Sequence, residues 1–335
     1  MVNWPVRSQC LSYTIKHRNK FCFTGGYLVS AVQLPGINNI VGLWPAVWSM
    51  GNLGRAGYGA SLDGTWPYTY DSCDVGTAPN QTIDGLPAAA ADYTLSYLPG
   101  QRLSRCTCDG ESHPGPKHSD GTYVGRSAPE IDVFEALVSD GTGQVSQSGQ
   151  WAPFNAGFIW DNSTDNLIIA DSSVSTFNTY VGGLFQQATS VVSETNPDCY
   201  QLASGCFAIY GFETVSLICF EGYASDNAVT RLDNNAAGMR ADAATEISAR
   251  PVPQEPMYIM ANLGMSTNFG DVDLDHLTIP CSHDPDNINI GCDPEDFPTA
   301  EYIATYSEAY QNPNLTTWVD DYGQTIPKNS LVDGC

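Results

Sequence analysis

Short apolar segments, separated by turns rich in glycine and proline, recur along most of the 335 residues. Residues 27–34 (YLVSAVQL) lie between a Gly-Gly and a Pro-Gly pair, which is typical of a strand bounded by turns. Residues 40–50 form a second apolar segment, interrupted by Pro45. Many short strands with frequent turn residues favour an all-β sandwich over a helical bundle. Further short strands are expected at 157–160, 167–170, 206–212 and 257–263.

Two stretches depart from this pattern. Residues 51–126 are long, loop-rich and contain three cysteines that could pin them by disulfides. Residues 299–311 instead carry apolar and tyrosine side chains at helical spacing, with a proline before and after. We therefore expect one short C-terminal helix that packs on the sandwich through its tyrosines.

The net charge of −24, from 37 acidic and 13 basic residues, restricts the expected partners. Such a surface repels phosphate groups and anionic lipids, so no nucleic acid and no bare membrane is expected as a partner. A neutral polymer would meet no such repulsion. Because only 15% of residues are charged and 42% are hydrophobic, the chain is not a disordered acidic tail.

Eleven cysteines and three glycosylation sequons favour an oxidising compartment. Zinc is the alternative use of cysteine, but the close pairs at 106–108 and 281–283 lack the usual ligand spacing, so disulfides and no metal are expected. The basic residues 1–20 contain no apolar signal region, and no apolar run approaches the ~20 residues of a membrane helix. The sequons are at Asn80, Asn162 and Asn314.

Residues 127–135 (SAPEIDVFE) place three carboxylates in an otherwise apolar, β-prone segment. In a regular strand Glu130 and Asp132 share a face, whereas Glu135 points to the other. One extra residue bulged between Asp132 and Glu135 restores the phase. Two glutamates on one face can lie roughly 5–5.5 Å apart, as a retaining glycosidase needs for a nucleophile and a proton donor. The aspartate between them can then tune the nucleophile.

A solvated strand face is the alternative interpretation of this motif, because an acidic chain produces such spacings by chance. The intervening Ile131, Val133 and Phe134 nevertheless commit the carboxylates to a strand rather than a loop.

The motif resembles the bulged active-site strand of glycoside hydrolase family 16, whose pattern is Glu, apolar, Asp, two apolar residues, Glu. Other blocks look like the fungal β-1,6-glucan synthesis-associated branch of that family, including LWPAVWSMGNLGRAGYG at 43–59 and RPVPQEPMYIMANLGMS at 250–266. The resemblance implies a two-sheet, concanavalin-like β-jelly roll with a glycan cleft and no cofactor. It also implies that Glu130 is the nucleophile, Asp132 its helper and Glu135 the acid/base.

Members of the branch are usually lumenal or cell-surface domains of type II membrane proteins, so the resemblance implies that location and an anchor that these residues do not contain. Aromatic rings stack on sugar rings, which makes the tryptophans candidates for glucan binding. Trp44 and Trp151 are favoured over Trp48, Trp66 and Trp160 because they lie in family-like blocks near the motif.

Three segments differ from the family pattern: 1–20 is atypically basic, 214–235 lacks expected tryptophans, and 276–292 lacks a closing strand. Some family strands are therefore expected to be missing. We divide the chain into an N-terminal segment (1–20), a jelly roll (21–290) and a C-terminal extension packed on it (291–335).

The sequence thus predicts a retaining glycosidase or transglycosylase that acts on β-glucan in fungal cell-wall β-1,6-glucan biosynthesis. Two alternatives stay open: a non-catalytic glucan-binding assembly factor, and an incomplete, poorly stable copy of the enzyme. The linkage, β-1,3 or β-1,6, is also left open.

Overall fold

The computed structural model describes somewhat more than half of the chain, and all structural statements concern those residues. They are 13–16, 18–41, 43–55, 65–66, 71, 73, 103–151, 164, 167–180, 187–214, 217–222, 228–233, 254–265, 277–278, 293, 298–311 and 322–323.

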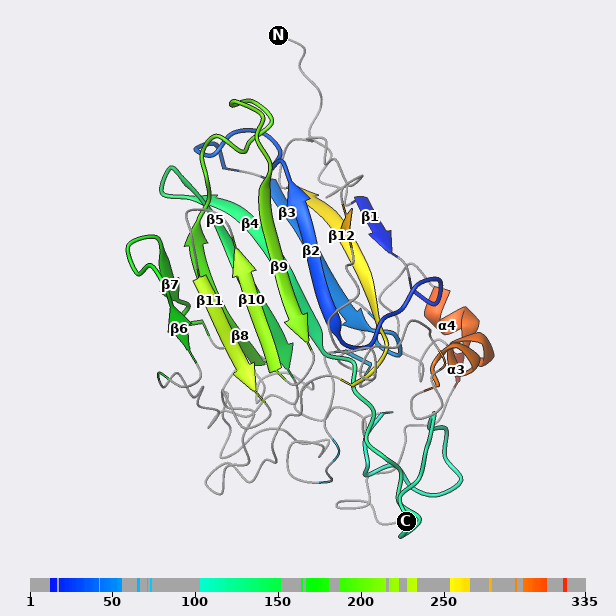
Figure 1. Ribbon diagram of the computed structural model, residues 1–335. Coiled ribbons are helices and arrows are strands. Elements are labelled where there is room, and N and C mark those ends of the chain that lie inside the picture. The colour runs from blue at the N-terminus through cyan, green and yellow to red at the C-terminus, as the bar shows by residue number, and fades with distance from the viewer. Residues whose placement is uncertain are drawn as a thin grey trace, which may run out of the picture.

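Two antiparallel β-sheets pack face to face (Figure 1). Within the described residues the first sheet has seven strands in the order β1-β12-β3-β4-β5-β8-β7. The second has six, in the order β13-β2-β9-β10-β11-β6. The expected all-β sandwich of jelly-roll type is confirmed. The first sheet comprises β1 (Tyr13–Lys16), β12 (Met257–Met265), β3 (Leu43–Gly51), β4 (Glu130–Ser139), β5 (Thr142–Trp151), β8 (Gln187–Glu194) and β7 (Ser175–Phe177). The second comprises β13 (Leu277–Thr278), β2 (Gly26–Val32), β9 (Ala208–Thr214), β10 (Leu217–Gly222), β11 (Ala228–Asp233) and β6 (Ile168–Ile169).

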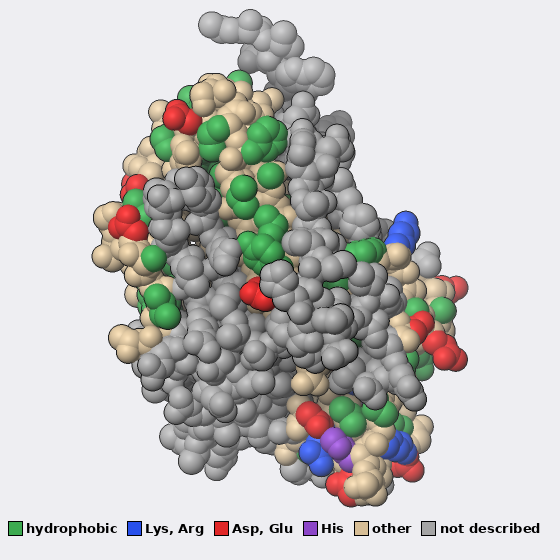
Figure 2. Space-filling view, in the orientation of Figure 1, with side chains coloured by type: hydrophobic (Ala, Val, Ile, Leu, Met, Phe, Trp, Pro, Cys, Tyr) green, Lys and Arg blue, Asp and Glu red, His purple; other side chains and the backbone are tan. Residues whose placement is uncertain are grey.

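The strands form where side chains alternate between core and solvent. In β9, Tyr210 and Phe212 are fully buried. Ile209, which lies between the buried Ala208 and Tyr210, points outward and is 48% exposed. This alternation is the period-two pattern of a strand with one buried face. Hydrophobic side chains consequently also gather on the outer face of the second sheet, over β2 and β9 (Figure 2).

The main core lies between the two sheets. Phe134 of β4 packs against Tyr210 of β9 with ring centroids 5.0 Å apart. Leu28 of β2, Val145 of β5 and Ile259 of β12 belong to the same buried cluster. Burying a side chain of this size stabilises the fold by about 1.5–3 kcal/mol, so this cluster sets the spacing of the sheets.

Most expected strands that fall on described residues are present. Segments 27–34, 206–212 and 257–263 correspond to β2, β9 and β12, and 167–170 contains β6. The expected strand at 157–160 lies outside the described residues. β3 runs through Pro45, which pairs with Leu263 of β12. Proline has no backbone N–H to donate, and it is tolerated here because the ladder from β3 to β4 begins only at Ala46.

All three segments that differ from the family pattern also supply strands, including the short β13 in 276–292, which pairs with β2. Residues 214–235 contain β10 and β11, which pair with each other and continue the sheet from β9. Residues 13–16 form β1 at the edge of the first sheet, paired with β12. The three domain boundaries stay a prediction.

The C-terminal helix is present but divided in two: α3 (Ala300–Thr305) and α4 (Ser307–Gln311). Tyr306 separates them because its backbone, at φ −108° and ψ 33°, leaves the helical conformation. The tyrosines pack as expected: Tyr302 packs against the buried cluster of Leu53, Leu103 and Ala128, and the Tyr310 hydroxyl donates a hydrogen bond to the Leu53 carbonyl at 2.9 Å. No helix of the described residues has the length and apolar character to cross a membrane.

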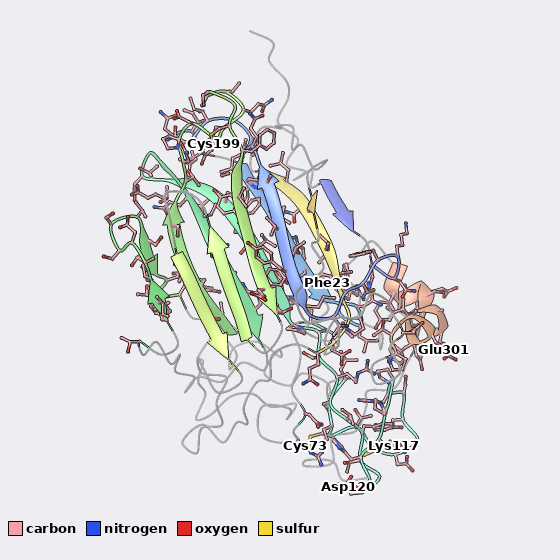
Figure 3. All side chains as sticks on the ribbon, in the orientation of Figure 1. Phe23, Cys73, Lys117, Asp120, Cys199 and Glu301 are labelled. Atoms are coloured by element: carbon pink, nitrogen blue, oxygen red, sulfur yellow. A yellow bond between two sulfur atoms is a disulfide. The ribbon has the colours of Figure 1, made fainter. Side chains whose placement is uncertain are left out.

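Two disulfides lie toward opposite ends of the molecule (Figure 3). Cys199 is bonded to Cys206 beside the start of β9, and Cys73 is bonded to Cys106 in the loop-rich segment. Cys22 and Cys108 are also disulfide-bonded. The predicted use of cysteine in disulfides, including the pinning of the 51–126 segment, is therefore confirmed for these residues.

Candidate active site

The three carboxylates of the sequence motif lie on β4, and the strand has a bulge between them. Asp132 pairs with Ser148 of β5 and Glu135 pairs with Ser146, so two residues of β4 oppose the single residue Gln147. The ladder to β3 shifts at the same place. The two residues that oppose Gln147 are Val133 and Phe134, one more than a regular ladder allows, and both are fully buried in the core between the sheets. The bulge expected from the sequence is present.

The bulge brings all three carboxylates to the outer face of the first sheet. Ile131 and Phe134 point into the core, so the residues that directly follow them, Asp132 and Glu135, point to the other face. Glu130, which directly precedes Ile131, points to that face too. Directly paired residues of antiparallel strands share a face. The neighbours of the carboxylates on this face are therefore Gln150, Ser148 and Ser146 of β5, and Met50, Trp48 and Ala46 of β3.

Polar side chains hold the first two carboxylates. Asp132, which is almost fully buried, accepts hydrogen bonds at Oδ2 from Ser148 Oγ at 2.6 Å and Gln150 Nε2 at 3.1 Å. Gln150 Nε2 also donates to Ser148 Oγ at 3.2 Å, which links the two donors. The indole Nε1 of Trp66 donates a hydrogen bond to Glu130 Oε2. Each carboxylate is thus oriented by a neighbour that is itself packed.

Burial raises the pKa of all three carboxyl groups above its ordinary value. For Glu135, burial and then the charge of Asp132 raise the pKa to about 8, against a smaller lowering by a hydrogen bond from Trp44. For Glu130, burial, then the charges of Asp132 and Glu135, raise the pKa, and the Trp66 hydrogen bond lowers it. For Asp132, burial raises the pKa and its hydrogen bonds lower it. Glu135 is consequently protonated in most molecules at neutral pH.

Tryptophan side chains lie beside the carboxylates of β4, and two of them, Trp44 and Trp48, belong to β3. Trp44, one of the two favoured tryptophans, is 53% exposed and forms the hydrogen bond to Glu135 described above. Trp48 is half-buried and donates from Nε1 to Asn262 Oδ1 at 2.6 Å. Trp66 is buried in a cluster with Met50 and Met260. An exposed indole beside a carboxyl group is a surface on which a sugar ring can stack.

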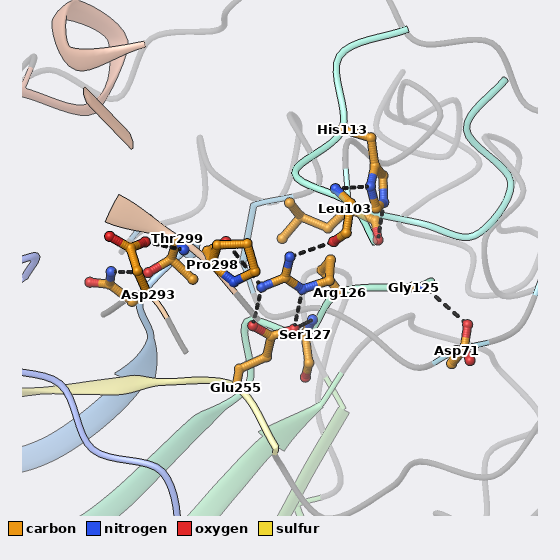
Figure 4. Close-up of polar contacts among 12 residues, drawn as sticks. Asp71, Leu103, His113, Gly125, Arg126, Ser127, Glu255, Asp293, Pro298 and Thr299 are labelled. Carbon is orange, nitrogen blue, oxygen red and sulfur yellow. Dashed lines mark hydrogen bonds and ion pairs between the residues drawn. The ribbon is translucent and has the colours of Figure 1, made fainter. Parts of the chain in front are cut away.

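The start of β4 is anchored by a buried ion pair (Figure 4). Arg126 Nε and Nη2 donate to the two carboxylate oxygens of Glu255, at 2.7 and 2.9 Å, and both side chains are buried. Arg126 also donates to the carbonyls of Gly115 at 2.6 Å and Pro298 at 3.3 Å. The Ser127 amide donates to Glu255 Oε1 at 3.1 Å. The ion pair therefore joins the loop-rich segment, and the residues that directly precede α3, to the strand that carries the carboxylates.

Several predicted site residues lie outside the described part of the chain. The sequons at Asn80, Asn162 and Asn314 do so, as does the side chain of Trp151. Their proposed roles in glycosylation and in glucan binding stay predictions.

Sequence reasoning missed the residues that hold the carboxylates in place. Ser146, Ser148 and Gln150 recur with period two in β5, and that alternation marks a polar strand face opposite the motif. Arg126 and Glu255 gave no such sign, because their contact joins positions 129 residues apart.

The fold and the site together define the class of protein: an antiparallel β-sandwich of jelly-roll type with a bulged, carboxylate-bearing central strand. The family model described as "Beta-glucan synthesis-associated protein SKN1/KRE6/Sbg1" matches residues 9–335. This chain belongs to that beta-glucan synthesis-associated family, which confirms the resemblance found in the sequence.

Two relatives give the degree of similarity. The chain is 42% identical to the beta-glucan synthesis-associated protein SKN1 of Candida albicans, over 96% of this chain and 42% of the relative. It is also 42% identical to the beta-glucan synthesis-associated protein KRE6 of Saccharomyces cerevisiae, over 95% of this chain and 43% of the relative. The chain thus spans less than half the length of these relatives.

Solved structures give a weaker likeness. A glycoside hydrolase family 16 protein from a Bacteroides ovatus mixed linkage glucan PUL, in complex with a G4G4G3G product, aligns with a TM-score of 0.34 and 14% identity over 79% of this chain and 66% of that one. The laminarinase from Rhodothermus marinus aligns with a TM-score of 0.33 and 14% identity over 75% of this chain and 59% of that one. Such scores carry no argument about the site.

Proposed function

We propose that this chain acts on β-glucan as a retaining glycosidase or transglycosylase in fungal cell-wall β-1,6-glucan biosynthesis. The observation that carries the proposal is the bulge in β4, which places Glu130, Asp132 and Glu135 on one outer sheet face. Neighbouring carboxyl groups on one strand face leave no room between them for the water that an inverting enzyme uses. The family description and the names of the relatives favour β-glucan as the substrate.

In the first half-reaction Glu130 is the nucleophile and Glu135 the acid. A carboxylate oxygen of Glu130 forms a bond to the anomeric carbon while the bond from that carbon to the glycosidic oxygen breaks. The electron pair goes to the leaving oxygen, which takes the proton of Glu135. The product is a glycosyl ester of Glu130 and a released sugar hydroxyl.

In the second half-reaction Glu135 acts as a base. It takes a proton from water or from the hydroxyl of a second sugar, whose oxygen attacks the anomeric carbon and releases the Glu130 carboxylate. Water gives hydrolysis and a sugar hydroxyl gives transfer. Two inversions at the same carbon produce net retention in both cases.

The hydrogen bonds of the site support these roles. Glu135, with its pKa raised to about 8, holds a proton at neutral pH and so has one to give. Trp66 donates to Glu130 and favours its ionised, nucleophilic form. Asp132, held by Ser148 and Gln150, lies between the two glutamates and is placed to accept a proton from Glu130.

The proposed location is the secretory lumen or the cell surface. Disulfides persist in oxidising compartments, and six cysteines of the described residues are disulfide-bonded. Trp44 is proposed to stack on a glucose ring, because its indole is exposed next to Glu135.

A pair of variants tests the proposal. Glu130→Gln keeps the shape of the side chain but cannot attack, so turnover of β-1,3- and β-1,6-gluco-oligosaccharides should vanish while glucan binding remains. Glu213→Gln is the matched control, since Glu213 is exposed on the other sheet and should retain full activity. Equal turnover in Glu130→Gln and the wild type would place the chemistry elsewhere. Glucan binding by a wild type that releases and transfers no sugar would identify a binding protein and refute the enzyme.

A further inference from the structure

Gln147 is a polar side chain within the core between the two sheets. It lies on β5 and is only 2% exposed, and it shares the inward strand face with Val145, a member of the main apolar cluster. A buried amide costs free energy unless its polar atoms are hydrogen-bonded. An apolar residue would serve packing at this position equally well, so the amide needs another explanation.

The amide of Gln147 is bonded to the bulge itself. Its Nε2 donates a hydrogen bond to the carbonyl oxygen of Val133 at 2.9 Å. The same nitrogen lies 3.5 Å from the carbonyl oxygen of Gly211, on β9 of the opposite sheet. Gln147 is also the one residue of β5 that opposes both Val133 and Phe134. Its backbone faces the bulge across the ladder, and its side chain holds the bulge from the core.

The bulge decides where Glu135 points. A shift of one residue moves a side chain to the other face of a sheet, so β4 without its extra residue would turn Glu135 toward the core. A bulge also disrupts the ladder locally, which leaves backbone groups in need of partners. A side-chain donor for the Val133 carbonyl therefore favours the bulged strand over the regular one.

We propose that Gln147 is a positioning residue, which fixes the β4 bulge through the Val133 carbonyl and so keeps Glu135 on the face of Glu130. The catalytic purpose of this arrangement rests on the proposed function, whereas the structural effect does not. Packing also holds the bulge, since the ring of Phe134 lies against Tyr210. The hydrogen bond requires a donor aimed at the Val133 carbonyl, whereas packing requires only apolar volume. Substitutions that change one and not the other therefore separate the two contributions.

Three variants separate them. Gln147→Met keeps the length of the side chain and removes the donor. Gln147→Glu keeps a donor, because a carboxyl group buried in this core stays protonated. Val145→Ala is the packing control, since it removes methyl groups from the same strand face without touching the bulge. The measurements are kcat on a gluco-oligosaccharide, the melting temperature, and the titration of the Glu135 carboxyl followed by 13C NMR.

Gln147→Met should lower kcat roughly 100-fold, because a displacement of about 1 Å has that effect on a catalytic group. The pKa of Glu135 should rise further, by about one unit or more, because a β4 strand that loses its bulge turns this carboxyl toward the apolar core. Gln147→Glu should retain the wild-type kcat and titration. Val145→Ala should lower the melting temperature but leave the Glu135 titration unchanged.

An unchanged Glu135 titration and kcat in Gln147→Met would overturn the proposal. If the wild type has no turnover, the proposed function fails, and the Glu135 titration alone then decides whether Gln147 positions the carboxyl. If Gln147→Met does not fold, hydrogen exchange of the wild-type side-chain amides decides. Slow exchange at Gln147 relative to the exposed Gln201 supports the proposal, and equally fast exchange refutes it.

Discussion

The indole of Trp66 donates a hydrogen bond to the carboxylate of Glu130, 64 residues further along the chain. Through this contact, a buried hydrogen-bond donor from the loop-rich segment binds the side chain that we propose as the nucleophile. A donor aimed at a carboxylate stabilises the charged form, so it opposes the effect of burial on the pKa of Glu130. The ionisation of the nucleophile therefore depends on a residue outside β4.

Trp66→Phe should raise the pKa of Glu130, because it removes the donor and leaves the burial. A hydrogen bond to a charged group contributes about 1.5–3 kcal/mol, which corresponds to about one to two pH units. The acidic limb of the kcat/KM profile should move to higher pH by that amount. Trp48→Phe is the control, since the Trp48 indole donates to Asn262 and not to a carboxylate. An acidic limb that is the same in Trp66→Phe and the wild type would contradict the assignment.

Glu135→Gln should stabilise the protein at alkaline pH. The pKa of Glu135 is about 8 in the folded protein and its ordinary value is 4.5, so the folded state holds the proton more tightly than the unfolded state. The free energy of unfolding of the wild type should therefore decrease as pH rises from about 4.5 to about 8. Glutamine carries no charge and should flatten this slope.

Urea unfolding at pH 4.5 and pH 8 measures the effect. We expect little difference between Glu135→Gln and the wild type at the lower pH, and a gain on the order of a few kcal/mol at the higher one. Glu213→Gln, on the exposed face of β9, should follow the wild type at both. A wild type whose stability rises across this range would show that burial of Glu135 is overstated.

Arg126→Met should lower the free energy of unfolding by about 3–5 kcal/mol, because it leaves the Glu255 carboxylate buried without its partner. Arg105→Met is the matched control: Arg105 is 3.5 Å from Asp120 in an ion pair with both side chains partly exposed, so the change should be within about 1 kcal/mol. Denaturant titrations of both variants provide the comparison. Similar small losses in the two would show that the buried pair does not anchor β4.

Peptide mapping of protein exported by a fungal host tests the proposed compartment. The disulfides Cys73–Cys106 and Cys199–Cys206 should be recovered as linked peptides. Asn80, in the loop-rich segment, should carry glycan. Mostly free thiols together with unmodified sequons would remove the protein from the secretory pathway.

The β4 bulge could be predicted from the sequence because local chemistry determines it. Ile131, Val133 and Phe134 are apolar and belong in the core, while the flanking carboxylates do not. Only one extra residue between Asp132 and Glu135 satisfies both demands within a single strand. The sandwich followed from similar reasoning, since strand periods and turn residues are also local.

The partners of the carboxylates could not be predicted, because they depend on which distant segments meet. Trp66 was one of five candidate tryptophans, and nothing in its neighbourhood distinguished a donor to Glu130 from a core residue. The division of the C-terminal helix at Tyr306 was also missed. The spacing of apolar residues continues through that position, and only the local backbone conformation reveals the break.

The stereochemistry of the reaction tests the central claim most directly. Proton NMR during the first minutes of turnover of a β-gluco-oligosaccharide shows which anomer forms before mutarotation. Two displacements through Glu130 and Glu135 predict the β-anomer as the first product, with no signal from Glu130→Gln. An α-anomer as first product would mean a single displacement by water, and the mechanism built on the bulged strand would then be wrong.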